Sequence, residues 1–291
     1  MRIYLDSRDH IHLTEKFSAK ETYAFETMLR RGSHELVFSL HNILECCAPL
    51  ARSRNRGSML KLLNQLERTP HAYIAETKIP TLELVEAIKS FSNGNEYDVV
   101  NPFVRRFDEV VSPFDAPDTR IYLKYGLADT IFDLWRSDTT VFLPYTDEAR
   151  RLAKIRATDR TSKNFRRHDL NFARTIAKNL RLYKIPLREN VVSDLATWIW
   201  ASPSRCPALR LSYEVFHRIN SNTKDQVRDS DISDFAHINC IPYVDVATLD
   251  GRMRAYVKQA DYAMGTEYHR KFCNDINSLE ITNTRDKREV L

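Results

Sequence analysis

Residues Asp229 to Asp250 have the sequence DSDISDFAHINCIPYVDVATLD, which joins a helical pattern to an apolar strand pattern. The pattern predicts a helix from Asp231 to about Asn239, with Ser230 as its N-terminal cap. Asp231 and Asp234 are three residues apart and would lie on one face of the first helical turn. The stretch therefore predicts a helix that presents carboxylates near its N-terminal end.

A strand is predicted directly after this helix. Pro242 is expected to stop the helix because proline lacks the backbone N–H that helical pairing needs. The apolar residues Tyr243 to Leu249 are then predicted to form a strand, and Asp250 follows it. Open α/β sheets bind their ligands at the carboxyl ends of the strands. The position of Asp250 thus favours a site at that edge of a sheet.

Two short strands near the N-terminus are also each followed by an acid. The strands and the polar residues that follow them are Ile3 to Leu5 with Asp6 and Ser7, and Glu35 to Phe38 with Ser39 and Glu45. Ser39 is in the position of a helix cap, and Glu45 would lie about two turns into the helix that follows. The alternation of strands and helices predicts an α/β fold with a parallel sheet flanked by helices.

Helical patterns predominate between these two parts of the chain. We therefore predict an α/β core made of residues 1–50 and 205–291, with a long, mainly helical insertion at 51–204. Within the second part of the core, Asp275 to Ile281 is predicted to be the last strand. The insertion separates the second acidic motif from the third.

One segment of the insertion, residues 151–188, is strongly basic. It holds twelve Lys and Arg residues against two Asp residues, so it carries +10 of a chain whose net charge is +5, and the rest carries −5. Phe165, Phe172 and Tyr183 are interleaved with the cations. Such a segment is typical of nucleic-acid binding, because cations neutralise phosphates and aromatic rings stack on bases. The residues predicted to bind are Arg166, Arg167, Arg174 and Lys178.

The composition indicates a soluble globular protein. The chain has 291 residues, of which 43% are hydrophobic, and no uncharged apolar run is long enough to predict a membrane span. Its five cysteines do not have the spacing of a zinc site, and we expect a cytoplasmic location. A glycine-rich phosphate loop and the motifs of Ser-His-Asp or Cys-His catalysis are absent.

The predicted acids suit one kind of chemistry. Like charges in one site raise each other's pKa, so a gathering of carboxylates is costly unless a cation offsets the charge. Hard oxygen ligands favour Mg²⁺ or Mn²⁺. These ions lower the pKa of bound water and stabilise the leaving oxygen of a phosphodiester. The acids therefore predict a metal-dependent hydrolase of phosphodiester bonds.

In this order, the motifs resemble those of the PIN-like nucleases. The matching strings are Ile3-Tyr4-Leu5-Asp6-Ser7, Leu36-Val37-Phe38-Ser39 with Glu45 six residues on, Ser233-Asp234-Phe235-Ala236-His237, and Pro242-Tyr243-Val244-Asp245-Val246 with Thr248-x-Asp250. By this resemblance Asp6, Glu45, Asp234 and Asp250 would be the catalytic metal ligands. Ser7, Ser39 and Thr248 would support them, and Asp231 is the alternative for the third acid.

The resemblance implies an endoribonuclease, with RNA preferred to DNA, in a toxin-like role or in defence against phage. A regulatory protein and a homo-oligomer are further expected partners. Two alternatives stay open. The chain is a non-catalytic PIN-like scaffold that binds RNA or a protein partner, or it is a phosphohydrolase of small nucleotides.

Overall fold

The structure is a computed structural model that describes residues 1–52, 56–111, 168–222 and 230–279 of the chain. One six-stranded sheet has the strand order β4-β3-β2-β1-β5-β6. Its strands are β1 (Arg2–Tyr4), β2 (Glu35–Ser39), β3 (His71–Ile74), β4 (Phe103–Val104), β5 (Val246–Thr248) and β6 (Phe272–Cys273). Neighbouring strands are parallel except for β3 and β4. The predicted α/β class is confirmed, but the sheet is mixed and mostly parallel, because β4 runs antiparallel to β3.

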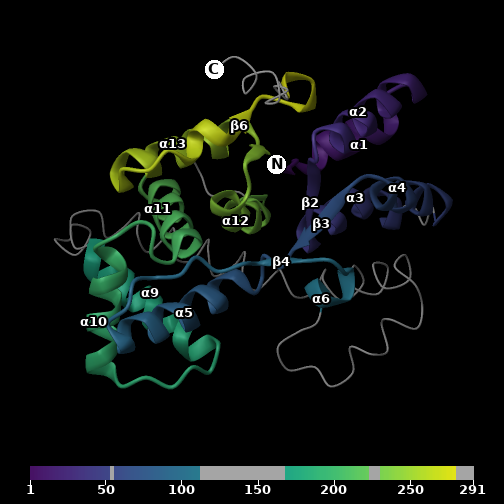
Figure 1. Ribbon diagram of the computed structural model, residues 1–291. Coiled ribbons are helices and arrows are strands. Elements are labelled where there is room, and N and C mark those ends of the chain that lie inside the picture. The colour runs from purple at the N-terminus through teal and green to yellow at the C-terminus, as the bar shows by residue number, and fades with distance from the viewer. Residues whose placement is uncertain (53–55, 112–167, 223–229, 280–291) are drawn as a thin grey trace, which may run out of the picture.

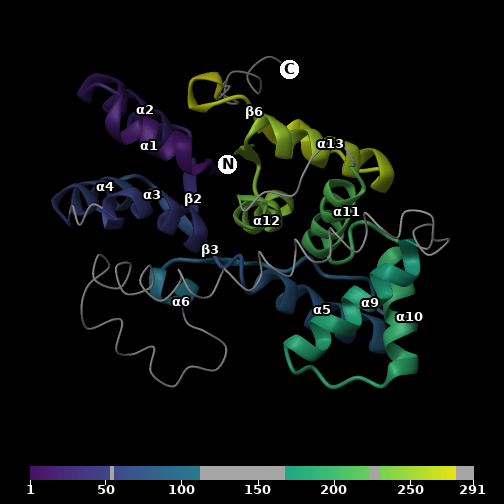
Figure 2. The ribbon, with the colours of Figure 1, turned by 180° about the vertical axis from the view of Figure 1, so that it is seen from behind.

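Helices surround this sheet (Figures 1 and 2). They are α1 (Ser7–Glu15), α2 (Ala19–Arg31), α3 (Leu40–Arg52), α4 (Arg56–Arg68), α5 (Ile79–Asn93), α6 (Phe107–Val111), α9 (His168–Leu182), α10 (Glu189–Trp200), α11 (Pro207–Ser221), α12 (Ser230–Cys240) and α13 (Gly251–Met264). Three single-turn 3₁₀ helices are η2 (Ile241–Tyr243), η3 (Tyr268–Lys271) and η4 (Ile276–Ser278). None of the helices described is long and apolar enough to span a bilayer.

Alternation along the strands divides the core between the two faces of the sheet. Successive strand side chains point to opposite faces, so Ile3 and Leu5 join one cluster of buried residues and Tyr4 joins the other. The first cluster packs against α1, α2, α3 and α4, and the second packs against α11, α12 and α13. The sheet therefore lies between two helical layers.

A third cluster joins α5, α9 and α10 to one side of α11. Its members include Leu84, Phe172, Ile176, Leu195 and Leu209. The helix α11 thus contacts two clusters, and it connects the sheet to the helical group seen beside α5 in Figure 1.

The sheet extends into the range that was predicted to be an insertion. Both β3 and β4 lie within residues 51–204, so the predicted core boundary at residue 50 is too early. These strands have only four and two residues, which is too short for a period of two to stand out from helical patterns.

The C-terminal prediction also needs correction. The last described strand is β6 (Phe272–Cys273), whereas Asp275 caps the 3₁₀ helix η4 by accepting N–H groups of Asn277 and Ser278. Over the described residues 275–279, the predicted strand is therefore wrong, because Asp275 caps a turn there instead of continuing an extended strand.

Candidate functional site

The site is built where the strand order reverses. From β1 the chain moves outward to β2 and β3, and it returns on the other side of β1 as β5 and β6. Such a switch point leaves a crevice at the carboxyl ends of the two central strands. Tyr4 of β1 is paired with Ala247 of β5, so Asp6 and Asp250 leave the sheet at the same edge. Two of the four predicted acids are thus brought to one edge of the sheet.

Each of these two aspartates also begins a helix. The side chain of Asp6 accepts the N–H of Arg8 at 2.9 Å, and it caps α1. The side chain of Asp250 accepts the N–H groups of Arg252 and Met253 at 2.6 and 2.9 Å, and it caps α13. Carboxylates suit this position because the N-terminal end of a helix is partially positive. The caps fix both side chains at the edge of the sheet.

Two of the predicted supporting residues tie the strands and helices of the site together. Thr248 is fully buried in β5, and its Oγ1 accepts the N–H of Asp6 at 2.7 Å. Ser7, the first residue of α1, donates its hydroxyl to Oε2 of Glu45 at 2.5 Å. The segment that follows β1 is therefore bonded both to β5 and to α3.

Glu45 is half-buried and is surrounded by polar groups. Besides Ser7, its Oε2 lies 3.1 Å from Nε2 of His237, and its Oε1 lies 3.5 Å from Nε2 of His41, one turn earlier on α3. Burial alone would raise the pKa of Glu45, but the hydrogen bonds and charges of these neighbours lower it to about 2. Glu45 is therefore a carboxylate at any physiological pH.

Three of the predicted acids act on the single imidazole of His237, which is 3% exposed. Burial lowers its pKa, but the hydrogen bond with Glu45 and the negative charges of Glu45, Asp6 and Asp234 raise the pKa above its ordinary value. Asp234 is half-buried and lies one turn before His237 on α12. Glu45 is the one of these three acids whose side chain bonds directly to the ring, whereas Asp6 and Asp234 act on it through their charge.

Ser39 supports the site indirectly, through Asn42 and Tyr4. Its hydroxyl oxygen accepts the N–H of Asn42 at 3.0 Å, as the predicted cap of α3 would, and it lies 2.9 Å from the hydroxyl of Tyr4. The amide of Asn42 donates to the carbonyl of Leu5 at 3.1 Å. These bonds join the start of α3 to the end of β1.

Several predicted residues fall elsewhere. Arg166 and Arg167 lie outside the described residues, as does the side chain of Asp231. Arg174 and Lys178 are exposed on α9, which packs with α5 and α10.

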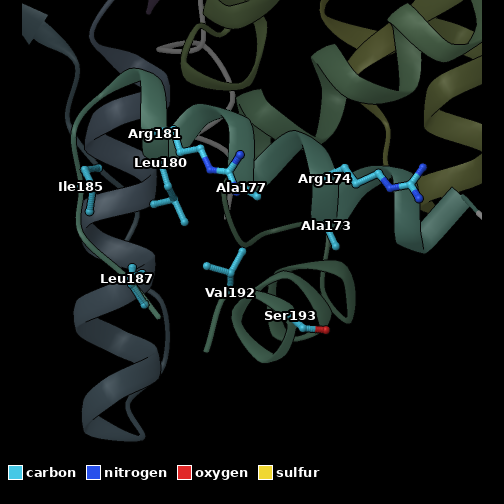
Figure 3. A pocket seen from close by; sticks show the side chains of 9 residues that line it. All are labelled: Ala173, Arg174, Ala177, Leu180, Arg181, Ile185, Leu187, Val192 and Ser193. Atoms are coloured by element: carbon cyan, nitrogen blue, oxygen red, sulfur yellow. The ribbon is translucent and has the colours of Figure 1, made fainter. Parts of the chain in front are cut away.

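Arg174 borders a cavity of about 300 Å³ between α9 and α10, lined mainly by aliphatic side chains such as Leu180, Leu187 and Val192 (Figure 3). Phe172 is fully buried in the third cluster, so it is not exposed for stacking on bases, contrary to the prediction. Phe172 faces the core because α9 must bury one side against α5 and α10, and Phe165 lies outside the described residues.

The donor set fits a hard divalent cation in its chemistry. Among the residues that the structure describes, no three His, Cys, Asp or Glu side chains are grouped so that they could hold an ion. Mg²⁺, however, keeps several waters and is bound through only one or two carboxylates. Burial raises the pKa of Asp6, so its anionic form is costly and a cation would offset that cost.

A buried carboxylate beneath the site gives a pH prediction. Glu76 accepts the N–H groups of Leu40 and His41 at 3.2 and 3.1 Å, and burial raises its pKa to about 7. An unfolded Glu has a pKa of about 4.3. The folded chain therefore binds more protons between these values, and this group makes the free energy of unfolding fall as the pH rises from about 4.3 to about 7.

Glu76→Gln is expected to remove this contribution, which is at most roughly 4 kcal/mol across the window. Urea unfolding at about pH 5 and about pH 8 measures it as the difference in free energy between the two pH values. The exposed Glu267→Gln variant should keep the wild-type pH dependence. An unchanged difference in Glu76→Gln would contradict the assignment.

The prediction from sequence did not include the two histidines among the site residues. His237 follows Asp234 by three positions, and His41 precedes Glu45 by four. Both spacings place the side chains on one helix face. In each case, the helix face that the histidine shares with an acid was the only feature of the local sequence that could have indicated a role in the site.

Comparisons of the chain with protein families, with curated proteins and with solved structures gave no match.

Proposed function

We propose that this protein is a divalent-metal-dependent endonuclease with a PIN-like core, and that its substrate is RNA. One observation carries the proposal. Asp6 and Asp250 follow neighbouring parallel strands at the switch point, and Glu45 bonds to the buried His237, whose pKa the charges of Asp6 and Asp234 also raise. Carboxylates that distant parts of a sequence bring to one edge of a sheet are the hard oxygen ligands that Mg²⁺ and Mn²⁺ prefer.

The topology supports the PIN-like assignment. The parallel strands β3-β2-β1-β5-β6 place the first acid after the central strand and the fourth after its neighbour. The second acid lies on the helix after β2, and the third lies on the helix before β5. The order of the acids along the chain and the elements that carry them support the proposed assignment.

The side chains of this site have separable roles in the proposed reaction. Asp6, Glu45, Asp234 and Asp250 would hold Mg²⁺ or Mn²⁺, which supplies Lewis acidity and lowers the pKa of bound water. Ser7 fixes one oxygen of Glu45, and Thr248 fixes the backbone of Asp6. By its resemblance, the protein would act on cellular or phage RNA, as a toxin or in defence.

A non-catalytic scaffold is the second candidate. It is favoured by the engagement of the carboxylates with protein groups, since Glu45 contacts Ser7, His41 and His237, and both aspartates cap helices. In a scaffold these bonds would be purely structural. The two candidates differ in whether the acids bind a metal.

The test is digestion of RNA and DNA pools, side by side, with Mg²⁺, Mn²⁺ or a chelator. We expect RNA cleavage that needs the metal and is lost in Glu45→Gln, while Glu267→Gln cleaves like the wild type. Mononucleotides in the same assay test phosphohydrolase activity. Cleavage that survives the chelator or the Glu45 substitution would contradict the proposal, and protein that binds no Mn²⁺ would support the scaffold.

A further inference from the structure

Both ring nitrogens of His237 are used, and they connect two parts of the site. Nε2 lies 3.1 Å from Oε2 of Glu45, and Nδ1 lies 2.5 Å from the hydroxyl of Tyr4. Tyr4 is fully buried in the central strand β1. The imidazole therefore bridges the centre of the sheet and the acid on α3.

The bridge continues into a chain of hydroxyl groups. The hydroxyl of Tyr4 lies 2.9 Å from Oγ of Ser39, and that oxygen accepts the N–H of Asn42 at 3.0 Å. Ser39 can also donate to Oδ1 of Asn42 at 3.3 Å. The chain joins β1, β2, α3 and α12, so the orientation of the ring is determined by four elements of the fold.

The bond to Glu45 determines which ring nitrogen of His237 carries a proton, and the hydroxyl chain is compatible with that choice. A carboxylate only accepts hydrogen bonds, so Nε2 must carry a proton to bond Glu45. In the neutral ring Nδ1 then accepts from Tyr4, which accepts from Ser39. In the charged ring Nδ1 donates to Tyr4, which donates to Ser39, and Ser39 donates to Asn42. Both arrangements satisfy every group and keep the Nε2–H bond to Glu45.

We propose that His237 is a positioning residue that, held by Tyr4, fixes the carboxylate of Glu45 for metal binding. The inference rests on the proposed function of the site. Glu45 lies on a helix, and its long side chain would otherwise sample several rotamers. Ser7 and His237 both donate to the same oxygen, which leaves Oε1 as the oxygen turned towards His41. Partners of this kind orient the groups that bind a metal.

The experiment compares His237→Leu, His237→Gln and Tyr4→Phe with the wild type. Mn²⁺ affinity is measured without substrate from the electron paramagnetic resonance of free Mn²⁺, and kcat and KM are measured on RNA. His237→Leu should lose about 10- to 100-fold in Mn²⁺ affinity and in kcat, with little change in KM. His237→Gln keeps an N–H donor and should lose less than about tenfold, and Tyr4→Phe should lie between it and the wild type.

The matched control is His269→Gln. His269 pairs with the buried Asp261 at 2.9 Å, outside the site, so its loss should change thermal stability and leave Mn²⁺ affinity and kcat as they are. If His237→Leu lowers only thermal stability, as the control does, the inference is overturned.

A measurement on the wild type keeps the test independent of folding of the variants. With ¹⁵N-labelled histidine, NMR above the pKa of His237 should show a proton on Nε2, the signal being assigned by its absence in His237→Gln. A proton on Nδ1 alone would overturn the inference. If the wild-type protein neither binds Mn²⁺ nor cleaves RNA, the proposed function is overturned. If the wild type does both, and His237→Leu binds Mn²⁺ and cleaves RNA equally well, only the inference about His237 is overturned.

Discussion

Replacing Asp250 with asparagine is expected to abolish metal-stimulated RNA cleavage while the protein stays folded. The amide oxygen of Asn can accept the N–H groups of Arg252 and Met253 that Asp250 accepts now, and Asn caps helices about as well as Asp. What the substitution removes is the negative charge. If that charge binds a catalytic metal, kcat/KM should fall roughly a thousandfold, which is about 4 kcal/mol of transition-state stabilisation.

Asp6→Asn should behave in the same way, because Asp6 caps α1 through the N–H of Arg8. The matched control is Asp275→Asn, which changes an aspartate that caps a turn outside the site. Cleavage rates and thermal unfolding are measured for all three variants. Full activity in both site variants would show that the aspartates are only caps, and a loss of folding in Asp6→Asn or Asp250→Asn would contradict the expected retention of the caps.

Alanine at the same positions distinguishes charge from capping further. Asp250→Ala removes both, so it should lose cleavage and also about 1 kcal/mol of stability relative to Asp250→Asn. The difference between the two variants measures the cap alone. If asparagine removes only activity and alanine removes both activity and stability, the side chain of Asp250 has two functions: its charge serves cleavage and its oxygen caps the helix.

Local signals explain which parts of the fold could be predicted from the sequence. The helix α2 (Ala19–Arg31) has clear local signals, because Ser18 and Glu21 form a capping box at its start and Gly32 follows its end. The helix α12 matches the prediction to within a residue at each end. Acids that directly follow short apolar strands, such as Asp6, are placed by the strand itself.

Contacts between distant parts of the chain explain what could not be predicted. His237 and Glu45 are 192 positions apart, and nothing near either residue encodes the bond between them. The short strand β3 shows the same effect, since it is recognisable only by its pairing with β2. The energetic contribution of these elements comes from tertiary contacts, which override weak local preference.

Leucine in place of Glu83 is expected to cause the largest loss of stability. Glu83 is fully buried on α5, and its carboxylate accepts the N–H groups of Ala208 and Leu209 at 2.7 and 2.9 Å and the hydroxyl of Tyr243 at 2.5 Å. It therefore caps α11 from another helix. Burial raises the pKa of Glu83 to about 7, despite these three donors.

The cost follows from the donors that the substitution would leave without a partner. Each buried donor that loses its acceptor costs about 1–3 kcal/mol, so Glu83→Leu should lower the free energy of unfolding by roughly 3–5 kcal/mol. Cys206, just before α11, has a φ of 51°, a left-handed conformation that costs energy for a residue with a side chain. The bonds from Glu83 to the next turn offset that strain, so their loss should also loosen the start of α11.

Urea unfolding measures this effect, and Glu86→Leu is the matched control on the same helix. Glu86 is half-buried, pairs with the exposed Lys89 at 3.1 Å and accepts the hydroxyl of the buried Ser90 at 3.1 Å, so the control should lose about 1–2 kcal/mol. Because α11 packs against α12 and α13, Glu83→Leu should lower cleavage only in proportion to the folded fraction. If Glu83→Leu loses no more stability than Glu86→Leu, the start of α11 does not depend on Glu83 as a cap. The three hydrogen bonds of the Glu83 carboxylate would then only balance the free-energy cost of burying it.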